Sequence, residues 1–136
     1  MTIDLETAAV ESLVARFAAL ALEQYEAMEY NFAFAFEGDK VKAEREQQHV
    51  NRLYWDLKAI EDELKRRAGD QRGALVELLR HPSEHVRLKA ATATLAVMPQ
   101  AARGELERIA APRIGPLAGA AGMLLLSLDR GDFKPT

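Results

Sequence analysis

Residues 75–97 read LVELLRHPSEHVRLKAATATLAV, and this stretch decides the fold. A leucine-rich segment is followed by a turn that contains Pro82 and then by an alanine-rich segment. Proline breaks a helix beyond its first turn and pushes the preceding residue toward extended geometry. Ser83 is therefore predicted to cap a new helix, with Glu84 at the positive end of the helix dipole. The stretch predicts a helix, a turn and a second helix.

The same turn holds two of the chain's three histidines, His81 and His85. Within one helix, a spacing of four residues offers two imidazoles to a single metal ion. Pro82 places His81 outside the helix and His85 in its first turn, where the two side chains do not share a face. We therefore interpret the pair as part of a helix start. The question that remains is whether Arg87 meets solvent, a neighbouring repeat or a partner.

Outward from this stretch, apolar residues recur with a period near 3.6, which predicts an all-α protein. An acidic first helix is predicted over 1–37 and a second long helix over 41–68. About four shorter helices follow, two within 70–97 and two within 99–130, separated by Pro and Gly, and 131–136 form a tail. A chain of 136 residues has the size of one domain, so we expect a single helical-repeat domain.

Each long helix has a predicted core face. The stripe of the first helix is Val10, Leu13, Val14, Phe17, Ala21, Met28 and Phe32. The stripe of the second helix is Val50, Leu53, Leu57, Ile60 and Leu64. Asp4 or Thr7 is expected to open the first helix. The alternating stretch NFAFAFEGD, residues 31–39, is interpreted as a helix end and turn that closes at Gly38, because a lone strand has no partner for its backbone.

The shorter helices repeat at an offset of 30 residues. The paired positions are Val76 and Leu79 with Leu106 and Ile109, and Ala90, Ala91 and Leu95 with Ala120, Ala121 and Leu125. Self-similarity of this length indicates stacked helix pairs. Residues 75–97 resemble a HEAT repeat, in which VRLKAATATL forms the second helix. Ser83 and Glu84 stand where such repeats usually carry Asp.

A longer resemblance covers ELKRRAGDQRGALVELLRHPSEHVRLKAATATLAV at 63–97 and GMLLLSLDRGDFKPT at 122–136. These stretches resemble the bacterial family catalogued as domain of unknown function 2019. The resemblance is strong from Asn51 to the C-terminus and poor before Phe36. It implies a HEAT/armadillo-like α-α superhelix, and it implies no reaction and no catalytic residues.

Composition excludes several classes of function. The chain has no cysteine, so thiol catalysis and disulfides are excluded. The net charge of the chain is -3. Residues 1–37 hold seven acids and one base and so carry a net charge of -6, which leaves the rest of the chain with +3. This balance argues against nucleic acid as the partner.

The longest apolar run, at 123–126, is far shorter than the roughly 20 residues that cross a bilayer, and the N-terminus does not resemble a secretory signal. We expect no membrane span and a cytoplasmic protein.

Glu46 and His49 form an E-x-x-H pair in the second helix, a spacing used in di-iron carboxylate bundles. Such a site needs a second E-x-x-H motif and two further glutamates, and Glu23 on the first helix is marginal to the apolar stripe. A hydrogen-bonded polar patch with Gln24 and Asn31 is the preferred interpretation. No metal and no other cofactor is predicted, and Glu46 and His49 are kept as weak metal candidates.

Trp55 lies opposite the apolar stripe of the second helix, among polar residues. An exposed tryptophan is a frequent interface anchor, so Trp55 is a partner-binding candidate. The preferred interpretation is that the second helix is packed on both sides, with Tyr54 facing the core.

Arg72, Arg80 and Arg87 are candidates for a basic groove that holds an anionic partner. The alternative is that basic residues cover helix ends, as expected for the KRR string at 65–67. The apolar segment GMLLLSL of the last helix needs a cover as well. Either Phe133 in the tail covers it and the protein is a monomer, or a second copy covers it in a homodimer.

The leading functional prediction is a non-enzymatic protein-protein interaction module that uses the curved surface of a repeat stack, in a more specific form a bacterial antitoxin or immunity protein. No nucleophile-base set and no phosphate loop is found, so no catalytic residue is predicted. The alternative is binding of nucleic acid or an anionic ligand through Arg72, Arg80 and Arg87. A metalloenzyme built on Glu46 and His49 is the third possibility.

Overall fold

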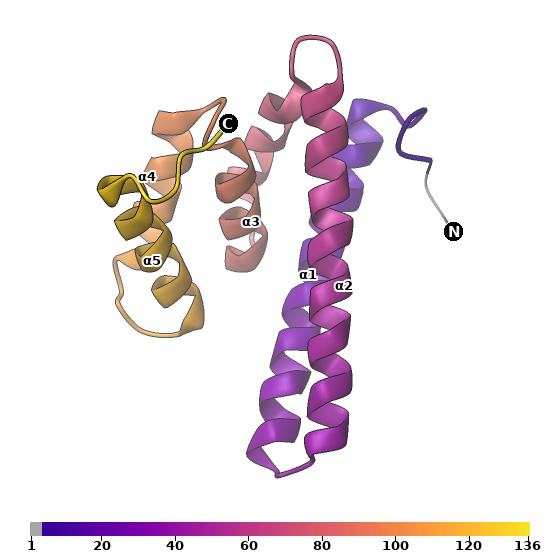
Figure 1. The fold of residues 1–136 in the computed structure, drawn as a ribbon, viewed down its shortest axis with the longest axis vertical. Helices are drawn as coiled ribbons and strands as arrows, with labels where there is room; N and C mark the ends of the chain where they lie inside the picture. Colours follow the sequence, from indigo (N-terminus) through magenta and orange to yellow (C-terminus); the bar gives the residue numbers. More distant parts are fainter. Residues whose placement is uncertain (1–3) are drawn as a thin grey trace. The chain divides into compact units, whose positions relative to one another are not determined.

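The computed structural model describes residues 4–136, and every regular element within them is a helix (Figure 1). The predicted all-α class is therefore confirmed. The chain divides into two compact units, the first ending at Gly69 and the second running from Asp70 to Thr136. The first unit holds the two long helices and the second holds four shorter ones, in the predicted order.

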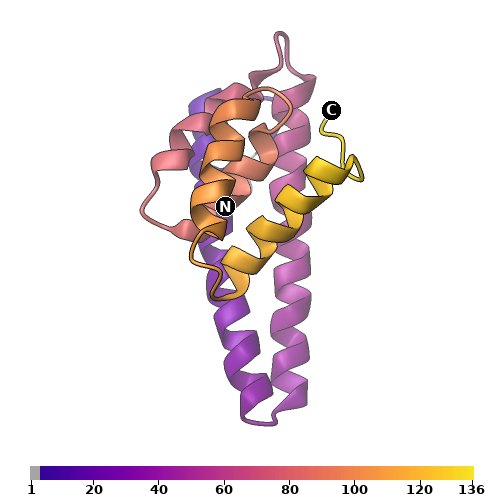
Figure 2. The same cartoon turned by 90° about the vertical axis from the view of Figure 1, so that its left-hand side faces the viewer.

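The first unit is a helical hairpin. Helix α1 spans Val10–Phe36 and α2 spans Lys40–Arg66, and both views show them side by side (Figure 1, Figure 2). Each helix has 27 residues and is about 40 Å long. The turn between them uses Gly38 at φ +84°, a conformation that glycine adopts at little steric cost. Asp39 then caps α2, because its Oδ1 accepts a hydrogen bond from the Lys42 backbone N–H at 3.1 Å.

Helix α1 begins later than predicted. Its N-cap is Ala9, which makes no side-chain capping bond. Asp4 accepts a hydrogen bond from the Glu6 backbone N–H at 3.0 Å, within a turn that precedes the helix. The predicted opening at Asp4 or Thr7 is therefore wrong. The end of the helix matches the prediction, since the alternating aromatic stretch is helical as far as the turn.

The hairpin core follows most of the predicted seam, although Val10, Met28 and Val50 are only half-buried and Phe32 is exposed. The buried side chains of α1 are Leu13, Val14, Phe17, Leu20, Ala21, Gln24 and Ala27. Those of α2 include Leu53, Leu57, Ile60 and Leu64 from the predicted stripe. Phe32 was expected in this seam but is 72% exposed. Asn31 continues the seam instead, because its Nδ2 donates a hydrogen bond to the Ala43 carbonyl oxygen of α2 at 2.7 Å, which leaves Phe32 on the solvent side.

The second unit begins with a helix whose type differs from the prediction. Residues Gln71–Arg80 form a 3₁₀-helix, η1, where an α-helix was expected. Its buried residues are Arg72, Leu75 and Leu78. These residues are three apart, and a 3₁₀-helix has three residues per turn, so they line one side of η1.

Three α-helices complete the second unit: α3 at Glu84–Thr94, α4 at Pro99–Ala110 and α5 at Pro116–Arg130. Helix η1 packs on α3, α3 packs on α4, and α4 packs on α5. The small residues buried in these helices are Ala90, Ala91, Ala93, Ala102, Ala118 and Ala121. Small side chains let neighbouring helix axes approach closely. Of the positions paired in the internal repeat, Ala120 is exposed.

The C-terminal tail leaves part of α5 open. The backbone N–H groups of Asp132 and Phe133 donate hydrogen bonds to the Ser127 carbonyl oxygen at 3.0 and 3.2 Å. Phe133 and Met123 are nevertheless exposed, so Phe133 covers the apolar face of α5 only in part. Within the described part of the chain, no helix combines the length and the apolar character that a bilayer crossing requires.

Candidate functional site

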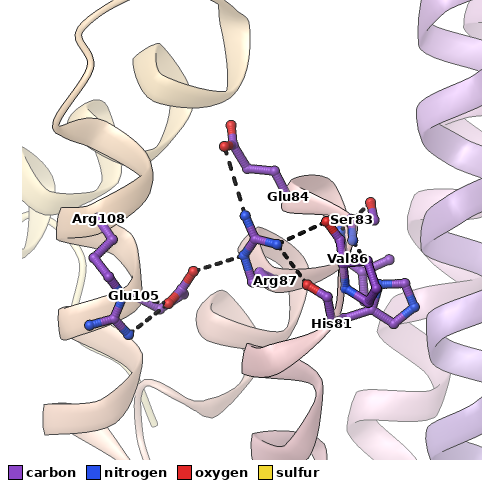
Figure 3. A network of polar contacts seen from close by, with 8 residues as sticks. His81, Ser83, Glu84, Val86, Arg87, Glu105 and Arg108 are labelled. Carbon is purple, nitrogen blue, oxygen red and sulfur yellow. Dashed lines mark hydrogen bonds and ion pairs between the residues drawn. The ribbon is translucent and has the colours of Figure 1, made fainter.

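The histidine turn has the predicted geometry (Figure 3). Ser83 is the N-cap of α3, and its Oγ accepts a hydrogen bond from the Val86 backbone N–H at 3.3 Å. His81 lies before the helix, where its Nδ1 accepts a hydrogen bond from the Ser83 N–H at 2.9 Å. His85 is buried in the first turn of α3. Because the two imidazoles have these separate roles, the interpretation as a helix start is confirmed.

His85 is an uncharged histidine. Burial, together with the nearby charge of Lys89, lowers the pKa of its imidazole from 6.5 to about 4. The side chain is therefore neutral at pH 7. Among the described residues, no group of three metal-binding side chains is present around this histidine or elsewhere.

Arg87 contacts the neighbouring helix (Figure 3). Its Nε donates a hydrogen bond to Oε1 of Glu105 on α4 at 2.9 Å. Its Nη1 donates to the carbonyl oxygens of His81 and Pro82, at 2.6 and 3.0 Å. The guanidinium therefore joins the turn before α3 to helix α4, and it is engaged inside the unit.

Glu105 is the acceptor on which this network centres. It is 5% exposed, and its second oxygen accepts hydrogen bonds from Nε and Nη2 of Arg108 at 2.8 and 2.7 Å. A buried carboxylate is tolerated when it is paired and its lone pairs are satisfied. Arg87 and Arg108 meet that requirement from two different helices.

The predicted basic groove is not assembled. Arg72 is buried, and its Nε and Nη2 donate to the two carboxylate oxygens of Asp70 at 2.9 and 2.7 Å. Its Nη2 also donates to the Thr136 carbonyl oxygen at 3.3 Å. Arg87 is committed to Glu105, so of the three candidate arginines only Arg80 is exposed.

The E-x-x-H pair joins α2 to α1. His49 Nε2 lies 2.9 Å from Oε2 of Glu23 on α1, and His49 Nδ1 lies 3.7 Å from Oε2 of Glu46. The two carboxylates approach opposite nitrogens of one ring. A single metal ion cannot be bound by all three side chains in this arrangement, because it contacts one ring nitrogen at a time. The group is a hydrogen-bonded link between the helices.

The predicted polar patch lies along the same hairpin seam. Gln24 is buried, and its Nε2 donates a hydrogen bond to the Val50 carbonyl oxygen at 3.2 Å. Asn31 makes the corresponding bond to Ala43 seven residues nearer the turn. Both amides therefore bond the backbone of α2, as expected of polar groups in a helix interface.

The far end of the hairpin is closed by arginines. Glu63 is buried on α2 and accepts hydrogen bonds from Arg67, at 2.9 Å to Oε2, and from Arg66. These bonds, from Arg67 first and Arg66 second, lower the pKa of the Glu63 carboxyl. Arg67 Nη2 also donates to the Leu5 carbonyl oxygen at 2.8 Å, so it ties the segment before α1 to the end of α2. Arg66 and Arg67 of the KRR string are therefore engaged by Glu63 near the end of α2.

Trp55 is on the surface. It is 66% exposed, and Tyr54 beside it is exposed as well, with the two rings edge to face at 5.1 Å. The expectation that α2 is packed on both sides, with Tyr54 facing the core, is wrong. The seam with α1 takes up one side of α2 only, and these rings lie outside it.

The exposure of Phe32 and Phe36 on α1 was not predicted. Phe36 is 84% exposed, and its ring stacks on that of Phe32 at 6.4 Å between centroids. Their signal was present in the sequence as a second apolar stripe, offset from the buried one. The sequence pattern alone did not indicate which of the two stripes faces α2.

Comparisons with known proteins agree on a family and a fold. The family model described as a domain of unknown function (DUF2019) matches residues 11–129. The match includes most of α1, where the sequence motifs predicted a poor resemblance. The crystal structure of the protein RPA1889 from Rhodopseudomonas palustris CGA009 is similar, with 41% sequence identity, a TM-score of 0.80, and coverage of 99% of this chain and 100% of that chain. No protein with a curated description matches the chain.

Proposed function

Because this chain belongs to the family described as a domain of unknown function (DUF2019), we propose its function from its own surfaces: it is a non-enzymatic module that binds another protein. The observation that carries the proposal is the exposure of large apolar side chains on the hairpin. Of the twelve such side chains exposed within the described residues, seven lie on α1, α2 or the turn between them. They are Leu22, Tyr30, Phe32, Phe36, Val41, Tyr54 and Trp55.

Exposed aromatic residues favour a protein partner. Tyrosine, tryptophan and phenylalanine are enriched in the cores of protein interfaces, where they supply most of the binding energy. A contiguous exposed apolar patch on a monomer marks an interaction site. The polar side chains described above are engaged in links between helices, which leaves the apolar surface of the hairpin as the best-supported functional feature.

The second unit serves this function as a rigid HEAT/armadillo-like stack. The internal repeat of 30 residues and the succession of packed helices from η1 to α5 support this assignment. Arg87 and Glu105 hold two consecutive helices of the stack together. A HEAT/armadillo-like superhelix therefore remains part of the proposal.

A bacterial antitoxin or immunity protein is the more specific form of the proposal. An acidic helical protein can mask the basic active site of a toxic enzyme. The acidic α1, with exposed Glu26 and Glu29 and with exposed Glu37 directly after its end, supports this form. It predicts a basic partner whose activity falls when the chain binds, in the cytoplasm.

Affinity capture from the native host tests the proposal. The tagged chain, a Trp55→Ser variant and the tag alone are compared by quantitative mass spectrometry. The expected result is one host protein captured in stoichiometric amount by the wild type and in reduced amount by Trp55→Ser. The absence of any specific protein would overturn the proposal.

A salt-sensitive association with duplex DNA would favour the nucleic-acid alternative. That alternative has less support because Arg72 and Arg87 are paired.

A further inference from the structure

Helix α1 carries a second stripe of mostly large apolar side chains, separate from the seam with α2. We call it the outer stripe, and it consists of Leu22, Tyr25, Glu29, Phe32 and Phe36. The spacing is three, four, three and four residues, which is the a/d pattern of a heptad repeat. Residues with this spacing lie on one face of a helix. The seam with α2 uses different residues, so the outer stripe is a second helix-packing face that the hairpin leaves open.

The outer stripe is exposed at four of its five positions, and Tyr25 is half-buried. Phe32 and Phe36 stack on each other, and Leu22 is also exposed. An aromatic side chain buries about 150–250 Å² when fully covered, so these two rings alone present roughly 300 Å². Apolar patches of that size on a monomer are often functional. The heptad spacing indicates what fits the patch: another helix, with its side chains inserted between those of the stripe.

The charges around the outer stripe specify the chemistry of that helix. Residues 22–37 contain four acids and no base. Glu23 is engaged by His49, whereas no ion pair within the described residues involves Glu26, Glu29 or Glu37. Glu29 lies at the middle of the stripe itself. An occupant therefore gains from basic residues that face Glu29 and border its own apolar side.

A second copy of this chain does not meet that requirement. If two α1 helices pair symmetrically about the middle of the stripe, Glu29 of one copy faces Glu29 of the other. Like charges that face each other across a helix interface are destabilising. From the heptad spacing, the exposed aromatic residues and the unpaired acids, we infer that the outer stripe is a docking site for a basic amphipathic helix of a partner protein. This inference rests on the proposed function and names the surface and the partner class.

Three synthetic peptides of equal length test the inference on the full-length chain. The first is a Leu/Lys peptide with leucines at heptad a and d positions, the second is its scrambled version with equal charge, and the third replaces every lysine with glutamate. Binding is measured by fluorescence anisotropy. We expect the first peptide to bind at least tenfold more tightly than either of the others. Phe32→Ser/Phe36→Ser should remove this preference, and Glu29→Lys should weaken binding of the first peptide by tenfold or more.

Ile114→Ser is the matched control, because Ile114 is 83% exposed in the second unit and its replacement should leave binding unchanged. Thermal melts check that each variant is folded. Equal binding of the scrambled peptide, unchanged binding by the Phe32→Ser/Phe36→Ser variant, or a wild-type homodimer that the Phe changes dissociate would each overturn the inference. If a host protein is captured equally well by the wild type and the double variant, the proposed function stands and the outer stripe is excluded. If no host protein is captured, the proposed function fails, and the peptides still decide whether the stripe binds a basic helix.

Discussion

Arg87 Nε on α3 and Glu105 Oε1 on α4 are joined by a hydrogen bond of 2.9 Å, and through it the turn that decides the fold is fixed to the next helix. The same guanidinium holds the carbonyl oxygens of His81 and Pro82. One side chain therefore fixes both the turn before α3 and the packing of α3 on α4. Arg87, which the sequence offered as a contact for an external partner, instead holds α3, its preceding turn and α4 together. We call this set of contacts the clamp.

Arg87→Ala is expected to destabilise the protein by about 1–3 kcal/mol, because Glu105 stays buried with one of its two partners removed. Urea unfolding measures the change in unfolding free energy. Arg103→Ala is the control, since Arg103 pairs with Asp129 at the surface and such pairs contribute about 1 kcal/mol or less. Equal losses for the two variants would contradict the clamp. Adding Glu105→Gln to Arg87→Ala should cost less than the sum of the two single changes.

Ser83→Ala is expected to cost about 1 kcal/mol of stability, because the backbone N–H at the start of α3 loses its side-chain acceptor. The loss should be visible as a lower denaturation midpoint with an unchanged slope. Ser12→Ala, on the exposed side of α1, is the control and should change the midpoint little. An unchanged midpoint for Ser83→Ala would show that the cap contributes nothing.

Because His85 is buried and neutral, we expect the protein to lose stability on mild acidification. Its pKa is lowered from 6.5 to about 4 in the folded protein, so the unfolded chain binds the proton more readily. Stability should therefore fall as the pH drops below 6.5 and stop falling, for this group, below about 4, by about 3 kcal/mol in all. In His85→Gln this part of the pH dependence should be absent. The two proteins are compared by urea unfolding at pH 7, 6, 5 and 4, and parallel curves would contradict the assignment.

Protonation of Glu63 should cause a separate loss of stability at lower pH. Its folded pKa is depressed below the ordinary value of 4.5 by Arg67 and Arg66. The stability that it contributes is therefore fully present above pH 4.5 and is lost as the pH falls through the folded pKa. Glu63→Gln should lower stability at pH 7 and flatten the acid limb of the curve below pH 4.5. If the acid limb of the variant matches that of the wild type, this carboxylate is not responsible for it.

Local signals in the sequence predicted the local structure well. Pro82 and Ser83 were sufficient to place the start of α3, and Gly38 marked the hairpin turn, because each restricts the backbone at its own position. The apolar stripe of α2 was likewise predicted, since its partner helix covers one face only. The all-α class followed from the same periodicity.

Contacts between distant residues were not predictable in this way. Helix α1 carries two stripes of large side chains, and periodicity does not indicate which one faces α2, so Phe32 was assigned to the core. Trp55, on α2, was assigned to a packed face although α1 covers only one side of α2. The hydrogen bond of Asn31 to Ala43 decides the seam, and it joins two helices. Arg87 and Glu105 are likewise brought together only when α3 packs on α4. The sequence therefore singled out Arg87 as a candidate, but the contacts that Arg87 makes depend on how the helices pack.

The most direct test of the account is quantitative capture of the host partner by two matched double variants. Phe32→Ser/Phe36→Ser alters the hairpin, and Met123→Ser/Ile114→Ser alters exposed apolar residues of the second unit. We expect the hairpin variant to capture at least tenfold less partner than the wild type and the second-unit variant to capture the same amount. Full capture by the hairpin variant together with loss in the second-unit variant would contradict this expectation, and would place the interaction at or near α5.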